Sequence, residues 1–327
     1  SRHALNVGVD AAVRRFRDNS GEDHDDYTIW AGGRVDVSRS GFLASEVRLA
    51  QRHEDRESPD DAQGFERTAF DLNSIVISYE IRPEANRLFM RLEGEYRGFA
   101  FEDSLGPFGP VNNDDRDRRE LNGTLRLGYT PIPSYSLFLQ GETRSIKYDD
   151  QFDDAGFQRD SDGDEVSLGV AMNYSGLVFG DIFFGYRSEK FNDPRFADID
   201  GPSFGADLAW NISGLTTLSI SGRRSVEPTT IVDVSGVVQT RLGLRVDHEL
   251  LRNLILGLEW SKVDEDFDGI DREDEIDTVD FSARYLMNRR AELVLAYSDR
   301  SRDSNPITAT GLRYSRGLIS ISAKIHW

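Results

Sequence analysis

One acidic stretch has the residue types and the spacing of a cation site. Residues 264–275, DEDFDGIDREDE, satisfy the pattern D-x-D-x-D-G-x5-E, with Gly269 at the sharp turn. Carboxylate oxygens at this spacing suit calcium, but the flanks alternate like strands, and a solvated acidic loop is the competing interpretation. We expect no resident cofactor, and calcium is the one cation that this pattern admits. Its candidate ligands are Asp264, Asp266, Asp268 and Glu275.

The five histidines offer little for catalysis. They stand in no metal-ligand spacing, and neither G-x-S-x-G nor H-E-x-x-H is present. Without any cysteine, the chain has no thiolate nucleophile and no disulfide. His24 and His53 lie near acidic segments, where a hydrolase at the rim of a membrane barrel would place an Asp/His site, but solvated loop histidines are the simpler interpretation. We therefore expect a protein that is not an enzyme.

Charged residues alternate with apolar residues along much of the chain. In residues 88–98, LFMRLEGEYRG, Leu88 and Met90 fall on one face of a strand, and Arg91 and Glu93 fall on the other. The same period of two recurs in residues 121–129, 238–246, 254–260 and 279–287. The charged candidates on these faces are Arg91, Glu93, Glu95, Arg97, Arg126, Glu142, Arg144, Arg187, Arg241, Arg245, Glu259 and Arg284.

About sixteen segments of this kind follow one another, with a range of roughly 14 to 18. They start near residues 3, 26, 42, 66, 87, 118, 135, 164, 177, 203, 215, 236, 252, 276, 290 and 308. The segment FDLNSIVISYE is the least regular, which predicts a β-bulge there. Short connections such as PIPS alternate with long acidic ones such as residues 149–165, as in an up-and-down sheet whose two ends differ. No linker stands out, so we expect a single domain over residues 1–327.

The charged face decides between a soluble and a membrane sheet. In a soluble barrel the inward face is the packed core, and burying unpaired charge costs several kcal/mol for each ion. With the apolar face against lipid and the charged face toward water, this cost disappears. The pattern therefore predicts an all-β fold, a transmembrane antiparallel up-and-down β-barrel with short periplasmic turns and long acidic extracellular loops. A soluble sandwich or solenoid is the alternative.

The last ten residues, LISISAKIHW, alternate up to Trp327. An even number of strands places both termini at the short-turn end, and closure of the barrel pairs the last strand with the first. We therefore expect residues 318–327 to pair with HALNVGVDAAV, with Ile319 and Ile321 facing lipid. Trp327 is expected at the periplasmic rim, where an amphipathic ring is favourable.

Composition is compatible with this fold. Only 38% of the residues are hydrophobic, 30% are charged, and the formal net charge is -19. No apolar run approaches the roughly 18 residues of a membrane helix. The opening residues SRHALNVGVD lack the basic and apolar regions of a signal peptide, as expected for a mature chain. Nothing in the charge or motifs predicts a nucleic-acid partner.

The sequence resembles a bacterial outer-membrane family, the putative β-barrel porin 2 family. The similarity is densest in LGLRVDHELLRNLILGLEW, DFDGIDREDEID and ARYLMNRRAELVLAYSDRSRDS, between residues 236 and 300. The resemblance implies the outer membrane of a Gram-negative bacterium, contact with lipid and lipopolysaccharide, and a terminal aromatic residue that serves as an insertion signal. It also implies a role in exopolysaccharide secretion, with polysaccharide as the transported material and periplasmic export components as partners.

Charge is distributed unevenly between the expected loops and strands. Eight long segments hold 39 Asp and Glu residues against 9 Lys and Arg, whereas the whole chain has 58 against 39. This predicts an acidic outer rim and a basic wall, which would favour anionic solutes inside the lumen. The function expected from the residues is a channel that passes hydrophilic material through a charged lumen. A general diffusion porin and a structural or adhesive barrel without an open pore are the alternatives.

Overall fold

The computed structural model describes residues 3–16, 20–61, 64–83, 87–106, 109–305 and 313–325. They form eighteen strands and two short 3-10 helices, η1 (Ser20–Glu22) and η2 (Asp114–Arg116). The strands are β1 (His3–Arg14), β2 (His24–Asp36), β3 (Gly41–His53), β4 (Ala69–Ile81), β5 (Leu88–Phe101), β6 (Ser104–Gly106), β7 (Gly109–Val111), β8 (Arg118–Ile132), β9 (Tyr135–Tyr148), β10 (Ser161–Tyr174), β11 (Val178–Phe191), β12 (Ile199–Ser213), β13 (Thr216–Glu227), β14 (Val237–Leu251), β15 (Leu254–Phe267), β16 (Glu273–Asn288), β17 (Ala291–Asn305) and β18 (Tyr314–Ile325).

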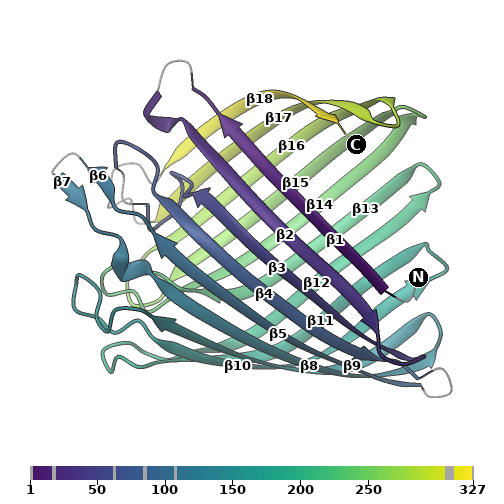
Figure 1. The fold of residues 1–327 in the computed structure, drawn as a ribbon, viewed down its shortest axis with the longest axis horizontal. Coiled ribbons are helices and arrows are strands. Elements are labelled where there is room, and N and C mark those ends of the chain that lie inside the picture. The colour runs from purple at the N-terminus through teal and green to yellow at the C-terminus, as the bar shows by residue number, and fades with distance from the viewer. Residues whose placement is uncertain are drawn as a thin grey trace.

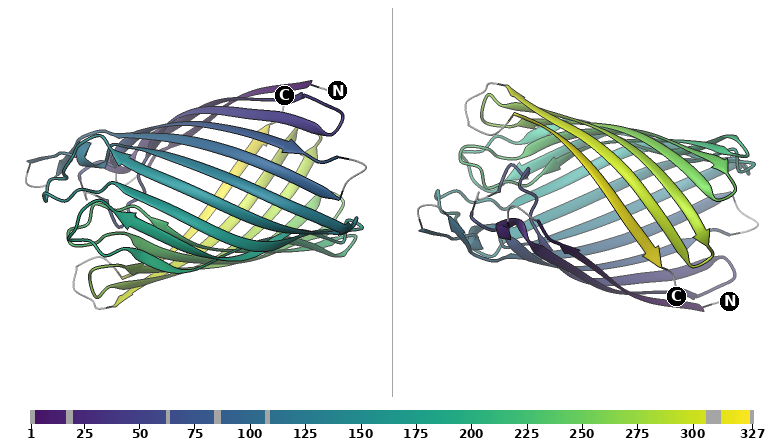
Figure 2. Two further views of the ribbon diagram at one scale, coloured as in Figure 1. Left: turned by 90° about the horizontal axis from the view of Figure 1, so that it is seen from below. Right: turned by 90° about the horizontal axis from the view of Figure 1, so that it is seen from above.

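Sixteen of these strands form one antiparallel sheet in chain order (Figure 1). The other two, β6 and β7, pair only with each other in the connection between β5 and β8. The sheet curls round so that its tilted strands enclose an interior (Figure 2). The predicted all-β, up-and-down architecture of about sixteen strands is confirmed. Each strand of the sheet begins within four residues of its predicted start, except β18, which begins at Tyr314 instead of near residue 308.

The two faces of the sheet differ as the alternation predicts. Large apolar side chains on the outer face are highly exposed, as at Leu168 and Phe184, each 68% exposed. Water would penalise so much exposed apolar surface, whereas lipid accepts it. Among the described residues, 24 buried side chains are polar or charged and only 11 are hydrophobic. The interior is therefore polar, and the apolar face is the one that meets the membrane.

The two ends of the barrel differ in the length of their connections. Short turns join β2 to β3, β8 to β9 and β10 to β11 at the end where both termini lie, and the long connections lie at the other end, where only residues 268–272 join β15 to β16 (Figure 1). Register shifts occur next to short turns, for example at Asn211/Ser213 and Glu249/Leu251. The bulge predicted in the fourth segment is wrong, because β4 pairs with β3 and β5 in an uninterrupted register.

The seam of the barrel lies between β1 and β18. The strand order starts at β1 and ends at β18, and the described residues of these two strands form no ladder with each other. Leu5 is 78% exposed and Ile321 is 72% exposed on these edges. The expected pairing of the first and last strands stays a prediction, and Trp327 lies outside the described residues. No helix in the described part of the chain has the length and apolar character to span a bilayer.

Candidate functional site

A polar cavity of about 670 Å³ lies against the charged face of the sheet. Nine of the twelve charged candidates border it, and they come from five strands, β5, β8, β9, β11 and β14. These nine are Arg91, Glu93, Glu95, Arg97, Arg126, Glu142, Arg144, Arg187 and Arg241. Their side chains share one face of each strand because they alternate with the apolar residues of the outer face.

Contacts between strands that are not neighbours show that this face is the concave one. Arg126 on β8 reaches Asp181 on β11, with Nη1 and Oδ2 2.7 Å apart. Arg223 on β13 lies 4.0 Å from Glu142 on β9, although the two strands are four steps apart in the sheet. Four steps along a sheet amount to about 19 Å. Side chains can close such a gap only across the inside of a curved wall.

Ion pairs occupy most of the charges around the cavity. Arg187 donates to Glu165 at 2.7 Å and to Glu142 at 3.0 Å, and Arg144 lies 3.1 Å from Glu189. All five side chains are at most 15% exposed, so their charges compensate one another away from bulk water. These contacts brace β9, β10 and β11 from the inside.

The cavity is close to neutral rather than basic. Seven arginines and six Asp or Glu residues line it, which corresponds to a formal charge of +1. The predicted basic wall is therefore wrong for this part of the lumen. Other strand arginines are neutralised by acidic residues at the loop end; Arg300, for example, lies 2.8 Å from Glu57, and Arg302 pairs with Asp274.

The remaining three candidates lie outside this cavity. Arg245 donates to Glu259 at 3.0 Å and to Asp247 at 2.7 Å, which makes a separate ion-pair group on β14 and β15. Arg284 on β16 has no ion pair within the described part of the chain, and it stands opposite Ile255 and Val294 in the ladders.

Sequence reasoning missed several cavity residues on β11, β12 and β13. Asp181, Asp207 and Arg223 line the cavity but were not among the candidates. Alternation would have identified Asp181, which lies an even number of residues before Arg187 and therefore on the same face of β11. The contact between Arg223 and Glu142 has no local signal, because it depends on the curvature of the sheet.

The connection between β3 and β4, described at residues 54–61 and 64–68, reaches across the loop end of the barrel. Asp60 accepts a hydrogen bond of 2.7 Å from the hydroxyl of Thr229 and one of 3.2 Å from the backbone N–H of Thr230. These threonines follow β13, which is eight steps from β3 in a sheet of sixteen strands. The contact therefore joins opposite sides of the mouth. We call these described residues, 54–61 and 64–68, the β3–β4 loop.

Charged contacts hold the β3–β4 loop at further points around the rim. Glu54 accepts two hydrogen bonds from Arg116 of η2, at 2.5 and 2.9 Å, and both side chains are buried. Glu57 lies 2.8 Å from Arg300 on β17 and 3.0 Å from Arg316 on β18, and the backbone carbonyl of Glu57 accepts a hydrogen bond from Arg302. The loop thus bridges η2 and the last two strands.

A third anchor of the β3–β4 loop is Glu22 in η1. Its two carboxylate oxygens accept hydrogen bonds of 2.8 Å from Arg56 and from Arg67. Partial burial acts to raise the pKa of Glu22, but the hydrogen bonds from Arg67 and Arg56 outweigh it and hold that pKa below its usual value. The anchor is therefore strongest when Glu22 is ionised.

The connection between β13 and β14 lies at the same end of the barrel. Arg159, from the connection between β9 and β10, donates to the backbone carbonyls of Val234 at 2.5 Å and Ile231 at 3.0 Å. Val234 packs with Val237 and Phe267 in a small apolar cluster that is almost fully buried. Together with the β3–β4 loop, this connection lies across the loop end of the barrel.

The structure does not give the acidic segment 264–275 the geometry of a calcium loop. Asp264 and Asp266 lie on β15, Glu275 lies directly opposite Asp264 on β16, and Asp268 accepts a hydrogen bond from Ser235. Lys262 already lies 3.2 Å from Asp264 and 3.4 Å from Glu275. Among the described residues, no group of three His, Cys, Asp or Glu side chains could hold a metal ion. The calcium-loop interpretation therefore lacks support.

The two rim histidines lie together, with ring centroids 5.2 Å apart. His24 donates from Nδ1 to the carbonyl of Glu22 at 2.7 Å, and its Nε2 accepts from Arg14 at 3.0 Å. His53 donates from Nδ1 to Asp26 at 3.1 Å. Neither ring has a Ser or Thr hydroxyl among its described partners. The geometry gives these histidines a packing role between β2 and β3 and no nucleophile to activate.

Comparisons with known proteins agree with this architecture. The family model of putative β-barrel porin 2 matches residues 1–326. In fold, the chain is similar to P. aeruginosa FpvA bound to a pyoverdine (TM-score 0.54, 6% identity, 100% of this chain and 55% of that chain). It is also similar to the copper transporter OprC (TM-score 0.51, 10% identity, 97% of this chain and 58% of that chain). The chain spans little more than half the length of either protein, and the comparison with curated proteins finds no match.

Proposed function

Because the chain belongs to the putative β-barrel porin 2 family and folds as an outer-membrane β-barrel, we propose that it forms a gated hydrophilic pore in the outer membrane of a Gram-negative bacterium. The observation that carries the proposal is the polar cavity on the concave face, bordered by charged side chains from five strands. Water and hydrophilic solutes are favoured in such a space, whereas a structural barrel would fill it with packed side chains.

The wall of this pore is bipolar rather than uniformly charged. Arginines and carboxylates are mixed around the cavity and present positive and negative groups in nearly equal number. Such a wall binds no single ion strongly, but it can exchange hydrogen bonds with a hydroxyl-rich solute along the path. Arg91, Glu93, Glu95, Arg97, Arg126, Glu142, Arg144, Arg187 and Arg241 are the proposed lumen-lining residues of the cavity; Arg245, Glu259 and Arg284 would line the wall outside it.

Exopolysaccharide secretion is the specific version of this proposal. The family resemblance supports it, and the bipolar wall suits a polymer of hydroxyl groups. Export would require periplasmic components to deliver the polymer and lipopolysaccharide to surround the barrel. In a strain that lacks the gene, secreted polysaccharide should fall, and the wild-type gene should restore it. Normal secretion in the deletion strain would contradict the export role.

Closure of the mouth is the second feature of the proposal. The β3–β4 loop is attached to η1, η2, the β13–β14 connection and the last two strands, so its release would widen the loop end while Arg159 still holds the β13–β14 connection. A permanently sealed structural barrel is the competing function that this closure favours. Vesicles that contain the protein separate the two: entry of small sugars after release of the loop supports a gated pore, and vesicles that stay impermeable support the sealed barrel.

A further inference from the structure

A row of phenylalanines and glycines runs across the inner wall between the short-turn end and the polar cavity. Each member stands directly opposite the next in the ladders of neighbouring strands. The row consists of Phe89 on β5, Gly128 on β8, Phe138 on β9, Gly169 on β10, Phe183 on β11 and Gly205 on β12. We call it the Phe–Gly row.

Each ring of the row covers the glycine of the next strand. A Cβ atom added to Gly128 would lie 2.1 Å from the ring of Phe89, and one added to Gly205 would lie 2.2 Å from the ring of Phe183. The same holds for Gly169 and Phe138, at 2.2 Å. All three glycines have ordinary backbone angles, so the space that the ring occupies, not the conformation, requires glycine.

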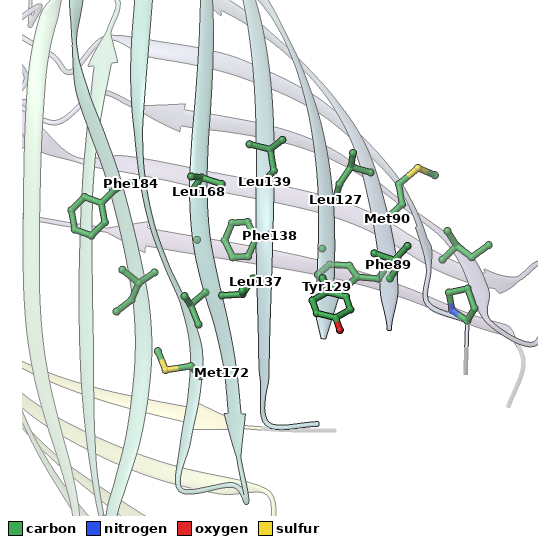
Figure 3. A pocket seen from close by; sticks show the side chains of 17 residues that line it. Phe89, Met90, Leu127, Tyr129, Leu137, Phe138, Leu139, Leu168, Met172 and Phe184 are labelled. Carbon is green, nitrogen blue, oxygen red and sulfur yellow. The ribbon is translucent and has the colours of Figure 1, made fainter. Parts of the chain in front are cut away.

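This arrangement keeps the rings against the wall. Phe89, Phe138 and Phe183 form one buried cluster and are 8%, 3% and 8% exposed. Figure 3 shows the rings of Phe89 and Phe138 at the same level of the wall. If side chains replaced the glycines, the rings would have to turn away from the wall, and the interior is the open direction.

The row also supports charges of the cavity. The guanidinium of Arg126 stacks 4.0 Å above Phe138 and donates to Gln140 at 2.8 Å and to Asp181 at 2.7 Å. Phe183 itself borders the polar cavity. Stacking of a guanidinium on an aromatic face restricts its position as well as adding attraction.

We propose that the Phe–Gly row sets the width of the lumen at the short-turn side of the polar cavity and fixes Arg126 in place. The glycines leave space in the wall for the three phenylalanine rings, so the rings lie at this level without narrowing the lumen. This assignment rests on the proposed pore, because width matters only for a lumen that solutes enter. Gly128 and Gly205 are thus width-determining positions in spite of having no side chain.

The test changes one glycine of the row and one matched glycine. In Gly205→Ala the three atoms nearest to the added methyl group all belong to the ring of Phe183, so the ring must move while the backbone can stay. Gly201→Ala is the control, because Gly201 lies on the same face of the same strand and nothing lies within 4 Å of an added Cβ. Ser225→Cys, at the border of the cavity in a chain without cysteine, reports access to a water-soluble thiol reagent.

We expect Gly205→Ala to slow the reaction of the thiol reagent with the cysteine of Ser225→Cys. It should also lower the conductance of the pore measured after the β3–β4 loop has been released by substitution of its anchoring residues. Gly201→Ala should change neither the reaction rate nor the conductance. Adding Phe183→Leu to Gly205→Ala should restore both values, because the smaller side chain fits beside the methyl group. If Gly205→Ala does not fold, Gly128→Ala takes its place, because the three atoms nearest to its added methyl group all belong to the ring of Phe89.

The outcomes separate this inference from the proposed pore. A folded Gly205→Ala barrel with unchanged thiol reaction and unchanged conductance overturns the role of the row and leaves the pore intact. Slower thiol reaction in a barrel that passes no ions supports the role of the row and contradicts the pore. A loss of thermal stability alone, with both readouts unchanged, would mean that the row only packs the wall, and would also overturn the proposal.

Discussion

The hydroxyl of Thr229 donates a hydrogen bond of 2.7 Å to Asp60 and thereby joins two loops whose strands lie eight steps apart in the sheet. Because the strands between them span half of the barrel, this single contact reaches across its mouth. Thr229 is 3% exposed, so the contact is shielded from competing water. The contact therefore ties the β3–β4 loop across the end of the barrel that lies above the polar cavity.

Removal of the hydrogen bond between Thr229 and Asp60 should weaken the attachment of the β3–β4 loop at the loop end of the barrel. Asp60→Ala leaves the buried hydroxyl of Thr229 without its acceptor, which costs about 1–3 kcal/mol in the closed state. We expect faster proteolytic cleavage within the β3–β4 loop and greater leakage of small solutes from vesicles. Glu66→Gln is the matched control, because Glu66 lies in the same loop and is exposed. Equal cleavage and leakage in the two variants would contradict the role of Asp60.

Loss of one partner of the buried Glu54–Arg116 pair should lower the stability of the protein more than replacement of both partners. Their side chains are 8% and 9% exposed, so Glu54→Ala leaves an uncompensated guanidinium inside the protein. Breaking such a pair costs about 3–5 kcal/mol, whereas replacing both partners by apolar residues of similar volume can cost far less. Thermal unfolding in detergent should therefore show Glu54→Leu/Arg116→Met to be more stable than Glu54→Ala. The reverse order would contradict the inferred burial.

Acid should weaken the anchor at Glu22. Its pKa in the folded protein is held below its usual value by Arg67 and Arg56, so ionised Glu22 stabilises the closed loop. The contribution is fully present above the ordinary glutamate pKa of about 4.3 and disappears as the pH falls through the lower folded value. Leakage from vesicles should rise in that acidic range, and Glu22→Gln should leak at neutral pH with less dependence on pH. A Glu22→Gln profile identical to that of the wild type would exclude this anchor.

Charge in the cavity should control ion preference. With seven arginines against six carboxylates, the cavity itself gives little preference between cations and anions. Glu142→Gln removes the partner of Arg187 and the neighbour of Arg223, which raises the formal charge of the cavity by one unit and should shift the reversal potential toward anions. Glu259→Gln changes the same charge outside the cavity and should shift it less. Equal shifts would place the selective region elsewhere in the barrel.

The seam should close in the membrane by pairing of β1 with β18. Val7 and Ile321 are exposed on the outer face, and residues opposite each other in an antiparallel ladder have Cα atoms about 4.5–5.5 Å apart, which suits a disulfide. The chain has no cysteine of its own, so an introduced pair gives an unambiguous cross-link. Val7→Cys combined in turn with cysteine at Ile319, Ile321 or Ala323 should cross-link in one register. Val7→Cys with Leu168→Cys, on distant strands, should not, and failure of all three pairs would contradict closure.

Local patterns predict the strands of this protein well because a period of two needs only neighbouring residues. The alternation around Arg91 and Glu93 was sufficient to place both on the charged face and at one cavity. Contacts such as Asp60 with Thr229 depend on how far the sheet curls and on the path of long loops, for which residues 54–68 give no periodic signal. The spacing of Asp264 and Glu275 suggested a calcium loop, but the tight turn between β15 and β16 and the neighbouring Lys262 give the carboxylates a different arrangement.

Single-channel recording in a planar bilayer tests the central claim, a hydrophilic pore closed by the β3–β4 loop. The variant Glu54→Gln/Glu57→Gln/Asp60→Asn keeps the size of the three side chains. It removes three of the charges that hold the loop to η2, β17, β18 and the β13–β14 connection. We predict rare openings for the wild type and for Glu66→Gln, and frequent openings of the same unit conductance for the triple variant. A folded triple variant that never conducts would contradict the pore, and a wild type that conducts continuously with the same open probability as the variant would contradict closure by the loop.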